Sequence, residues 1–373
     1  MKFTLNSKQL FDSVNSVASV VSKKASRPIL SNILFEIKNN KLEVVATDLD
    51  ISAKSIIDVK SESDTKFCLN TKNIHDILRE LPNDEIEIEI KDSENLINLK
   101  CKNVEYSLLI VPTNDFPISS FNHSEKQQIC INSELLKEII SKTSFAMSND
   151  ETRMFLNGIY FQEFNDKIRA VAIDGHRLAL IDKSIVSMKG SDSLSKGIII
   201  PRKGISELKK MSDSGELEDI TISFNESFLI ATNNQGNKLS IRLISREYPK
   251  YESVIPSKTN FAANFKRIDL YDAIKRIKIL SNENTKGIKF SFRNDKIELR
   301  ANNEAFGEAY ETVDASYDGE ELDMNLNAGY VLDTLSALES GDISFEINNS
   351  LSPLVIKSQS SPDFLGIIMP LRI

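Results

Sequence analysis

The residues best suited to chemistry lie in one short stretch, Asp174-Gly175-His176-Arg177. A carboxylate, an imidazole and a guanidinium this close together could perform acid–base catalysis, with Asp48 as a second carboxylate. However, Asp48, Asp174 and Asn303 occupy equivalent places in three sequence repeats. A carboxylate that recurs in this way is more typical of a turn or cap at a strand end than of a catalyst. The pattern therefore favours a structural role.

Standard catalytic and cofactor motifs are absent from the sequence. It contains only three histidines, and no His-Glu-x-x-His, Gly-x-x-x-x-Gly-Lys or Gly-x-Ser-x-Gly pattern occurs. Cys68, Cys101 and Cys130 are odd in number, far apart and outside any Cys-x-x-Cys pair, which argues against disulfides and structural zinc. We therefore expect no enzymatic activity, no cofactor and no metal site.

The elements that must position these residues occur in three copies. A strand followed by an amphipathic helix is predicted at residues 3–21, 129–143 and 265–280. A second strand–helix pair is predicted at residues 67–81, 198–211 and 324–338, and a strictly alternating strand follows it at residues 85–90, 219–224 and 342–347. Because the order of elements is the same each time, the chain contains three homologous units.

The repeats predict an α+β fold with two helices and about eight short antiparallel strands in each domain. Domain I is expected to span residues 1–125, domain II residues 126–257 and domain III residues 258–373, with boundaries in polar stretches of the chain. A single catalytic cleft gains no obvious advantage from triplication. Triplication suits curved or closed architectures with quasi-equivalent surfaces, which favours a ring or a scaffold.

The charge is unevenly distributed. The net charge is −8, which disfavours a protein that grips nucleic acid with its whole surface. Cations nevertheless gather near the predicted helices, most densely on the fifth: Lys266, Arg267, Lys275, Arg276 and Lys278. They are either ordinary solvated side chains or contacts to duplex phosphates, which would attract DNA without reading its sequence.

No apolar run approaches the roughly 20 residues that a membrane-spanning helix needs. The first residues, Met1 to Asn6, alternate like a strand and do not open a signal peptide. We therefore expect a cytoplasmic location and no membrane partner.

Six segments, in order and over all three repeats, resemble those of the bacterial DNA polymerase III beta subunit, the beta sliding clamp family. They are residues 27–33, 46–49, 155–158, 172–179, 280–283 and 369–373. The resemblance implies DNA-clamp domains and a head-to-tail homodimer that closes a ring around duplex DNA, slides without sequence specificity and serves as the processivity factor of DNA replication. It also implies several protein partners: the replicative DNA polymerase catalytic subunit, the clamp loader, and other polymerases and repair proteins with clamp-binding motifs. A structural repeat protein that does not bind DNA would fit the repeats but not the basic helices.

The resemblance further implies a pocket that accepts short partner peptides. An apolar groove with adaptable methionine, rimmed by histidine and arginine, suits peptides with one or two hydrophobic anchors. The matching positions are Leu156, Ile173, Gly175, His176, Arg177, Leu178, Pro249, Val254, Tyr330, Leu351, Ile367, Met369, Pro370, Leu371 and Arg372.

Some positions depart from the family pattern. Ile173 replaces a usual threonine, Ser253 stands where some members have arginine, and Pro353 stands where serine is common. These changes could shift the preferred peptide. For DNA contact the resemblance points to Lys24, where an arginine would offer a bidentate fork to phosphate, and the further candidates are Arg153, Arg202 and Arg276.

Overall fold

The computed structural model describes residues 1–22, 27–61, 63–91, 95–117, 121, 127–184, 187–189, 194–213 and 219–372, with the backbone alone at 187–189. The chain divides into two compact units. Unit 1 comprises Met1–Leu136, Ile185–Ser193 and Ser206–Leu243, and unit 2 comprises Lys137–Ser184, Leu194–Ile205 and Ile244–Ile373. Among the described residues, no helix is both long and apolar enough to cross a bilayer.

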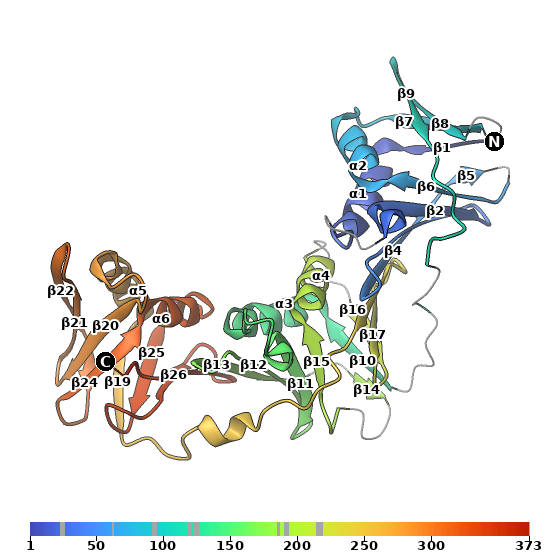
Figure 1. Cartoon of the computed structure of the whole chain (residues 1–373). Coiled ribbons are helices and arrows are strands. Elements are labelled where there is room, and N and C mark those ends of the chain that lie inside the picture. Colours follow the sequence, from blue (N-terminus) through green and yellow to red (C-terminus); the bar gives the residue numbers. More distant parts are fainter. Residues whose placement is uncertain are drawn as a thin grey trace. The chain divides into compact units, whose positions relative to one another are not determined.

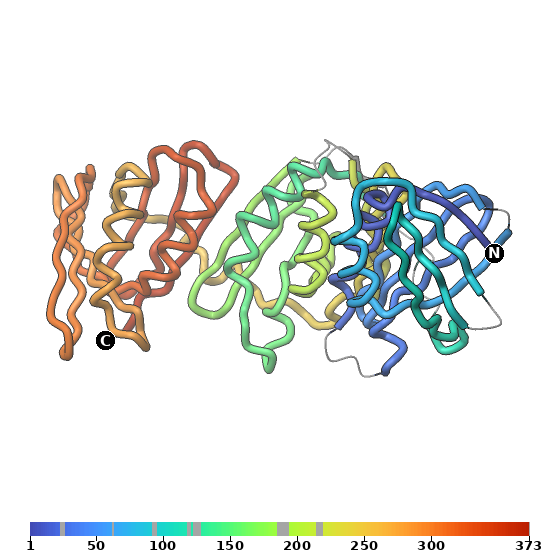
Figure 2. Tube along the Cα trace, turned by 90° about the horizontal axis from the view of Figure 1, so that it is seen from above, coloured from blue at the N-terminus to red at the C-terminus, as the bar shows by residue number. Residues whose placement is uncertain are grey.

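Unit 1 contains two antiparallel sheets (Figure 1). Their strand orders are β5-β1-β7-β8-β9 and β14-β10-β16-β17-β18-β4-β3-β2-β6. In the second sheet β18, from the second repeat, pairs with β4 of the first, and the two strands lie side by side (Figures 1 and 2). The elements of the first repeat are β1 (Lys2–Asn6), α1 (Ser7–Ala18), the 3-10 turn η1 (Pro28–Ser31), β2 (Asn32–Lys38), β3 (Lys41–Thr47), β4 (Ile51–Asp58), β5 (Lys60–Ser61), β6 (Thr65–Asn70), α2 (Thr71–Glu80), β7 (Glu85–Lys91), β8 (Leu96–Cys101) and β9 (Val104–Leu109). Those of the second repeat in unit 1 are β10 (Gln127–Asn132), β14 (Ser187–Lys189), β16 (Asp219–Phe224), β17 (Phe228–Thr232) and β18 (Lys238–Arg242).

Unit 2 repeats this plan. Its sheets have the orders β15-β11-β12-β13-β27-β26-β25-β19-β23 and β22-β21-β20-β24, and β27 of the third repeat pairs with β13 of the second. The elements from the second repeat are η3 (Ser144–Ala146), η4 (Met154–Leu156), β11 (Gly158–Phe164), β12 (Lys167–Ile173), β13 (Arg177–Lys183), β15 (Ile198–Pro201) and η5 (Tyr251–Val254). Those from the third are β19 (Phe261–Lys266), α5 (Arg267–Ile277), η6 (Lys278–Leu280), β20 (Gly287–Arg293), β21 (Lys296–Asn303), β22 (Gly307–Asp314), β23 (Ser316–Tyr317), β24 (Leu322–Asn327), α6 (Ala328–Ser336), β25 (Asp342–Ile347), β26 (Leu354–Ser358) and β27 (Phe364–Ile368). The remaining helices are α3 (Ser133–Thr143) and α4 (Arg202–Ser212).

Local sequence explains where several helices begin. Asn6, Asn70 and Asn327 end their strands with extended backbone, and each side-chain oxygen accepts backbone N–H groups of the helix that follows. This N-cap satisfies donors that have no partner within the helix. The apolar faces then bury Leu10, Val14 and equivalent residues. Two helices per repeat and all-antiparallel sheets confirm the predicted α+β fold.

Strand alternation is confirmed at residues 85–90 and 342–347, whereas in β16 Ser223 is buried between Ile222 and Phe224. In β7 every second side chain is buried, and β25 has the same period. The described residues form nine strands in each repeat, compared with about eight predicted, because a very short strand such as β5 or β23 joins the edge of a sheet. Strands of two residues carry too little periodicity to be recognised from sequence.

Candidate functional site

The predicted pocket residues converge within unit 2 on one apolar cluster. Buried Leu156, Leu178 and Ile367 pack together, and the partly buried Ile173 and Val254 lie against them. These residues come from η4, β12, β13, η5 and β27, so the cluster exists only once the second and third repeats pair through β13 and β27. The structure thus brings together side chains that lie far apart in the sequence.

A tight turn between β12 and β13 carries three of the predicted pocket residues, Gly175, His176 and Arg177. Asp174 Oδ1 accepts the backbone N–H groups of His176 at 2.8 Å and Arg177 at 3.0 Å, and Gly175 has φ +94°. Glycine adopts this left-handed conformation without the steric cost that other residues incur. Asp174 is therefore the turn residue that the repeat predicted.

The Arg177 guanidinium is held between carboxylates and aromatic rings. Its Nε donates to Asp174 Oδ2 at 3.0 Å and its Nη1 to Asp333 Oδ2 at 2.6 Å. The guanidinium carbon lies 4.5 Å from the centre of the Tyr330 ring, a cation–π distance. Partial burial and the nearby Asp174 carboxylate raise the pKa of Tyr330, so this phenol stays protonated at neutral pH.

The C-terminal segment that follows β27 is hydrogen-bonded to this turn and to β24. Met369 N–H donates to His176 O and Leu371 N–H to Asn325 O, each at 2.8 Å. Met369 is 38% exposed, and Leu351, in the turn before β26, is 73% exposed. These side chains are accessible to a partner, as are those of Pro370 and Arg372 at the end of the segment.

Three tyrosines that sequence reasoning missed, Tyr160, Tyr248 and Tyr251, belong to or pack against the same apolar cluster. Tyr248 and Tyr160 stack with their centroids 4.6 Å apart, and the Tyr251 hydroxyl accepts a hydrogen bond from Gln162. Burial raises the pKa of Tyr251 to about 12. Tyr248 and Tyr251 flank Pro249 and hold the segment that carries Val254 against the sheet. The recurrence of Phe116-Pro117 as Tyr248-Pro249 in the next repeat was the available signal.

The predicted DNA contacts are not brought together in the same way. Lys24 lies outside the described residues. Arg153 donates to Asp150 at 2.9 Å, and its Nη1 lies 3.2 Å from where a Cβ on Gly175 would stand, which places it at the rim of the pocket. Arg202 donates to Met147 O and Ser148 O, and burial lowers its pKa. Arg276 pairs with Glu311.

Other basic residues on the helices are exposed, among them Lys203, Lys209, Lys266 and Lys275. Lys142, on α3, differs because it is buried. Its side chain is 5% exposed, and its Nζ donates to Glu138 at 2.6 Å and to Ser361 at 2.8 Å. Among the described residues, no group of three or more His, Cys, Asp or Glu side chains is arranged to hold a metal ion.

Comparisons with known proteins cover almost the whole chain. Three family models match: DNA polymerase III beta subunit, N-terminal domain, at residues 1–120; central domain, at residues 130–250; and C-terminal domain, at residues 252–372. The beta sliding clamps of Vibrio cholerae and Pseudomonas aeruginosa are 29% and 30% identical to the chain, each over the full length of both proteins.

Solved structures agree with this match. The sliding clamp (DNA polymerase III subunit beta) of Bartonella birtlesii bound to griselimycin has a TM-score of 0.94 and 30% identity, with both chains covered completely. The sliding clamp of Bacillus subtilis has a TM-score of 0.92 and 26% identity, covering 100% of this chain and 99% of that one.

Proposed function

Because the chain belongs to the DNA polymerase III beta subunit family, the beta sliding clamps, we propose that two copies close head to tail into a ring around duplex DNA. The chain is a non-catalytic processivity factor of DNA polymerase III, built from three clamp domains. Family membership implies DNA and DNA polymerase as partners. The proposed domains span residues 1–125, 126–257 and 258–373, and the proposed location is the cytoplasm.

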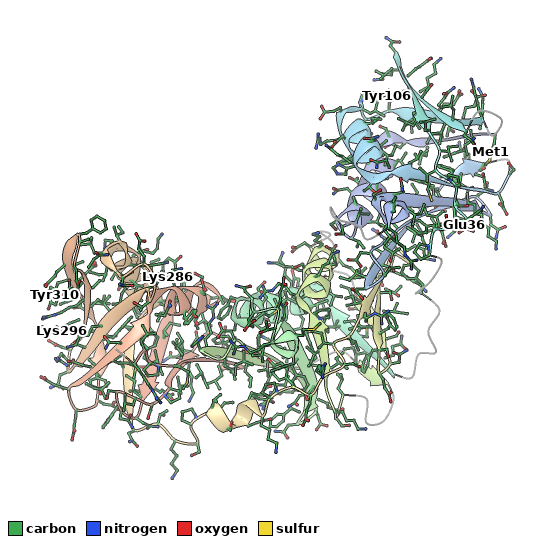
Figure 3. The ribbon with its side chains drawn as sticks, viewed as in Figure 1. Met1, Glu36, Tyr106, Lys286, Lys296 and Tyr310 are labelled. Atoms are coloured by element: carbon green, nitrogen blue, oxygen red, sulfur yellow. The ribbon has the colours of Figure 1, made fainter. Side chains whose placement is uncertain are left out.

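Two exposed sheet edges support dimerisation. β9 is the outermost strand of one sheet and β22 of another. They carry Leu109 and Tyr310, which are 74% and 53% exposed, and Figure 3 labels Tyr310 on β22 and Tyr106 on β9. A strand edge with exposed apolar side chains is a template for pairing with another chain. In the proposed dimer, β9 of one chain pairs with β22 of its partner.

The proposed grip on DNA is weak and independent of sequence. Exposed lysines such as Lys203, Lys209 and Lys275 would attract phosphates, and each contact releases counterions, so binding falls as salt rises. The ring itself, not the contact energy, would hold the chain on DNA. The candidates Lys24, Arg153, Arg202 and Arg276 remain proposals, and Arg276 would first have to exchange its Glu311 partner for phosphate.

The apolar cluster around Leu156, Leu178 and Ile367 supports the second half of the proposal, a pocket for short peptides. Exposed Met369 and Leu351 offer apolar contacts, and His176 with Arg177 forms a polar rim. The proposed occupants are motifs of the polymerase catalytic subunit, the clamp loader, and other polymerases and repair proteins. Griselimycin, which is bound to the similar sliding clamp of Bartonella birtlesii, is a candidate ligand of this chain.

The decisive experiment combines solution mass with retention on DNA. The chain is loaded on nicked circular DNA with clamp loader and ATP, and the DNA is then linearised. We expect a mass near twice 41.9 kDa and release only after linearisation. A monomer whose retention does not depend on DNA topology would contradict the ring.

A further inference from the structure

The turn that forms the pocket rim has a counterpart in the first repeat, within unit 1. Asp48 Oδ1 accepts the backbone N–H groups of Asp50 at 3.1 Å and Ile51 at 2.7 Å, as Asp174 does one repeat later. The following residue also has positive φ in both turns, +83° at Leu49 and +94° at Gly175. The two turns therefore have the same backbone design.

The neighbouring strands meet these turns in the same way. Ile241 of β18 pairs with Ile51, as Ile368 of β27 pairs with Arg177. The next residue then donates its backbone N–H to the turn: Arg242 to Asp50 O, and Met369 to His176 O, both at 2.8 Å. Arg242 is thus the structural counterpart of Met369.

The buried residues near the two turns also correspond. Leu30 N–H donates to Arg27 O at 3.1 Å in η1, and Leu156 N–H donates to Arg153 O at 2.9 Å in η4. Both leucines are buried. Buried Phe116, which packs with Cys68 and Val45, occupies the place of Tyr248. The junction of the first and second repeats thus keeps the framework of the peptide pocket.

The side chains that would meet a ligand differ. The first junction has Leu49 in the place of Gly175, where a Cβ would lie 3.2 Å from the Arg153 guanidinium. The first junction has Arg242 in the place of Met369, and Arg242 Nε pairs with Asp50 Oδ1 at 3.1 Å. The first junction also has Ser52 in the place of the apolar Leu178, and the Ser52 hydroxyl is hydrogen-bonded to the Thr47 hydroxyl at 2.7 Å.

We propose that Leu49 and the Arg242–Asp50 ion pair close this junction to hydrophobic peptide motifs. This inference rests on the proposed function, because it assumes that the framework between β13 and β27 is the pocket. The Arg242 and Asp50 side chains are 55% and 74% exposed, so a hydrophobic anchor seated there would have to move Leu49 and strip water from two solvated charges. Specificity then comes from elements that repel the ligand at the unused site.

Leu49 supports this reading through its backbone. A leucine at φ +83° adopts a conformation that glycine takes freely and other residues resist. A strained residue persists where the surrounding structure holds it, and strain of this kind is a pointer to a role of the side chain. Leu49 is 39% exposed, so neighbouring atoms cover most of it.

Native mass spectrometry can count bound peptides on the full chain. The probe is a fluorescent peptide with two hydrophobic anchors, a leucine and a phenylalanine. We expect one peptide per wild-type chain. The variant Leu49→Gly/Asp50→His/Arg242→Met should bind two, the second about tenfold or more weakly. Deleting Met369 to Ile373 from that variant should leave only the new site. Leu49→Gly/Arg242→Met serves as a milder variant should the triple variant melt without cooperativity.

Each outcome is informative. Two peptides per wild-type chain would show that the junction is already open and overturn the proposal. One peptide on every cooperatively folded variant would show that Leu49 and Arg242 do not close it, while leaving the pocket itself intact. No binding to the wild-type chain would overturn the pocket and this inference with it.

Discussion

Arg177 and Asp333 form an ion pair of 2.6 Å between the β12–β13 turn and helix α6. Arg177 is only 11% exposed, whereas Asp333 is 50% exposed. The pair joins a segment of the second repeat to one of the third at the rim of the proposed pocket. Because Arg177 also stacks on Tyr330, Asp333 helps to fix the position of two rim side chains at once.

The first prediction concerns Asp333→Ala. Without this partner the Arg177 guanidinium can leave its place over Tyr330, and we expect peptide affinity to fall about fivefold to thirtyfold, or about 1–2 kcal/mol. Fluorescence anisotropy with a labelled peptide measures the change. Asp333→Glu, which keeps the charge, should recover most of the affinity.

Glu339→Ala removes an exposed carboxylate just beyond α6 and is the matched control. It should bind peptide like the wild-type chain. Equal affinity for Asp333→Ala and wild type would mean that this ion pair does not position the pocket.

The second prediction concerns the C-terminal segment. Deleting Met369 to Ile373 removes the hydrogen bonds to His176 and Asn325 together with the exposed Met369 side chain. We expect peptide affinity to fall about a hundredfold or more, while light scattering still reports a dimer because β9 and β22 are unchanged. Persisting peptide affinity would rule out this rim as part of the pocket.

Much of the fold could be predicted from local sequence. The Asn–Ser and Asn–Thr pairs that start α1 and α2 are recognisable caps, and the period-2 pattern of residues 85–90 identifies β7. The period-2 strand recurs in all three repeats, whereas the capping asparagine does not, since Lys266 precedes α5 and Pro201 precedes α4. Where the pattern is short, as for the two residues of β5, no periodicity was available.

The site was predictable only in part, because side-chain direction depends on tertiary packing. Lysine side chains are mostly exposed, yet that of Lys142 turns inward to Glu138 and Ser361. The family pattern named Arg177 but not Asp333, which lies one helical turn beyond Tyr330. Arg177 and Asp333 are 156 residues apart in the sequence, so their pairing could be recognised only from the packing of the third repeat on the second.

The third prediction concerns acid stability. Burial opposes ionisation of Glu138, but hydrogen bonds from Lys142 and Lys183 outweigh it and hold its pKa below the ordinary value of 4.5. A lowered folded-state pKa means that the carboxylate stabilises the fold above pH 4.5, and that this contribution is lost as pH falls through the folded-state value. Glu138→Gln should therefore lower the free energy of unfolding at pH 7.

We expect a loss of about 2 kcal/mol at pH 7, less than for fully buried pairs because the Glu138 side chain is 31% exposed. Thermal or urea unfolding at pH 7, 5, 4 and 3 should show the gap between the two proteins closing with acid. Glu134→Gln, an exposed change in the same helix, should leave the curve unchanged. A gap that is constant from pH 7 to 3 would contradict the proposed role of ionised Glu138.

The fourth prediction concerns the start of α5, where the capping asparagine of other helices is replaced by Lys266. Its backbone is extended as an N-cap requires, but its side chain makes no capping hydrogen bond. Lys266→Asn should raise the free energy of unfolding by about 1 kcal/mol, measured by urea unfolding. Lys266→Ala is the matched control, because it removes the same exposed ion pair with Asp342 without supplying a cap. The free energy of unfolding of Lys266→Asn must therefore be higher than that of Lys266→Ala. Equal values would mean that a side-chain acceptor does not stabilise the first turn of α5.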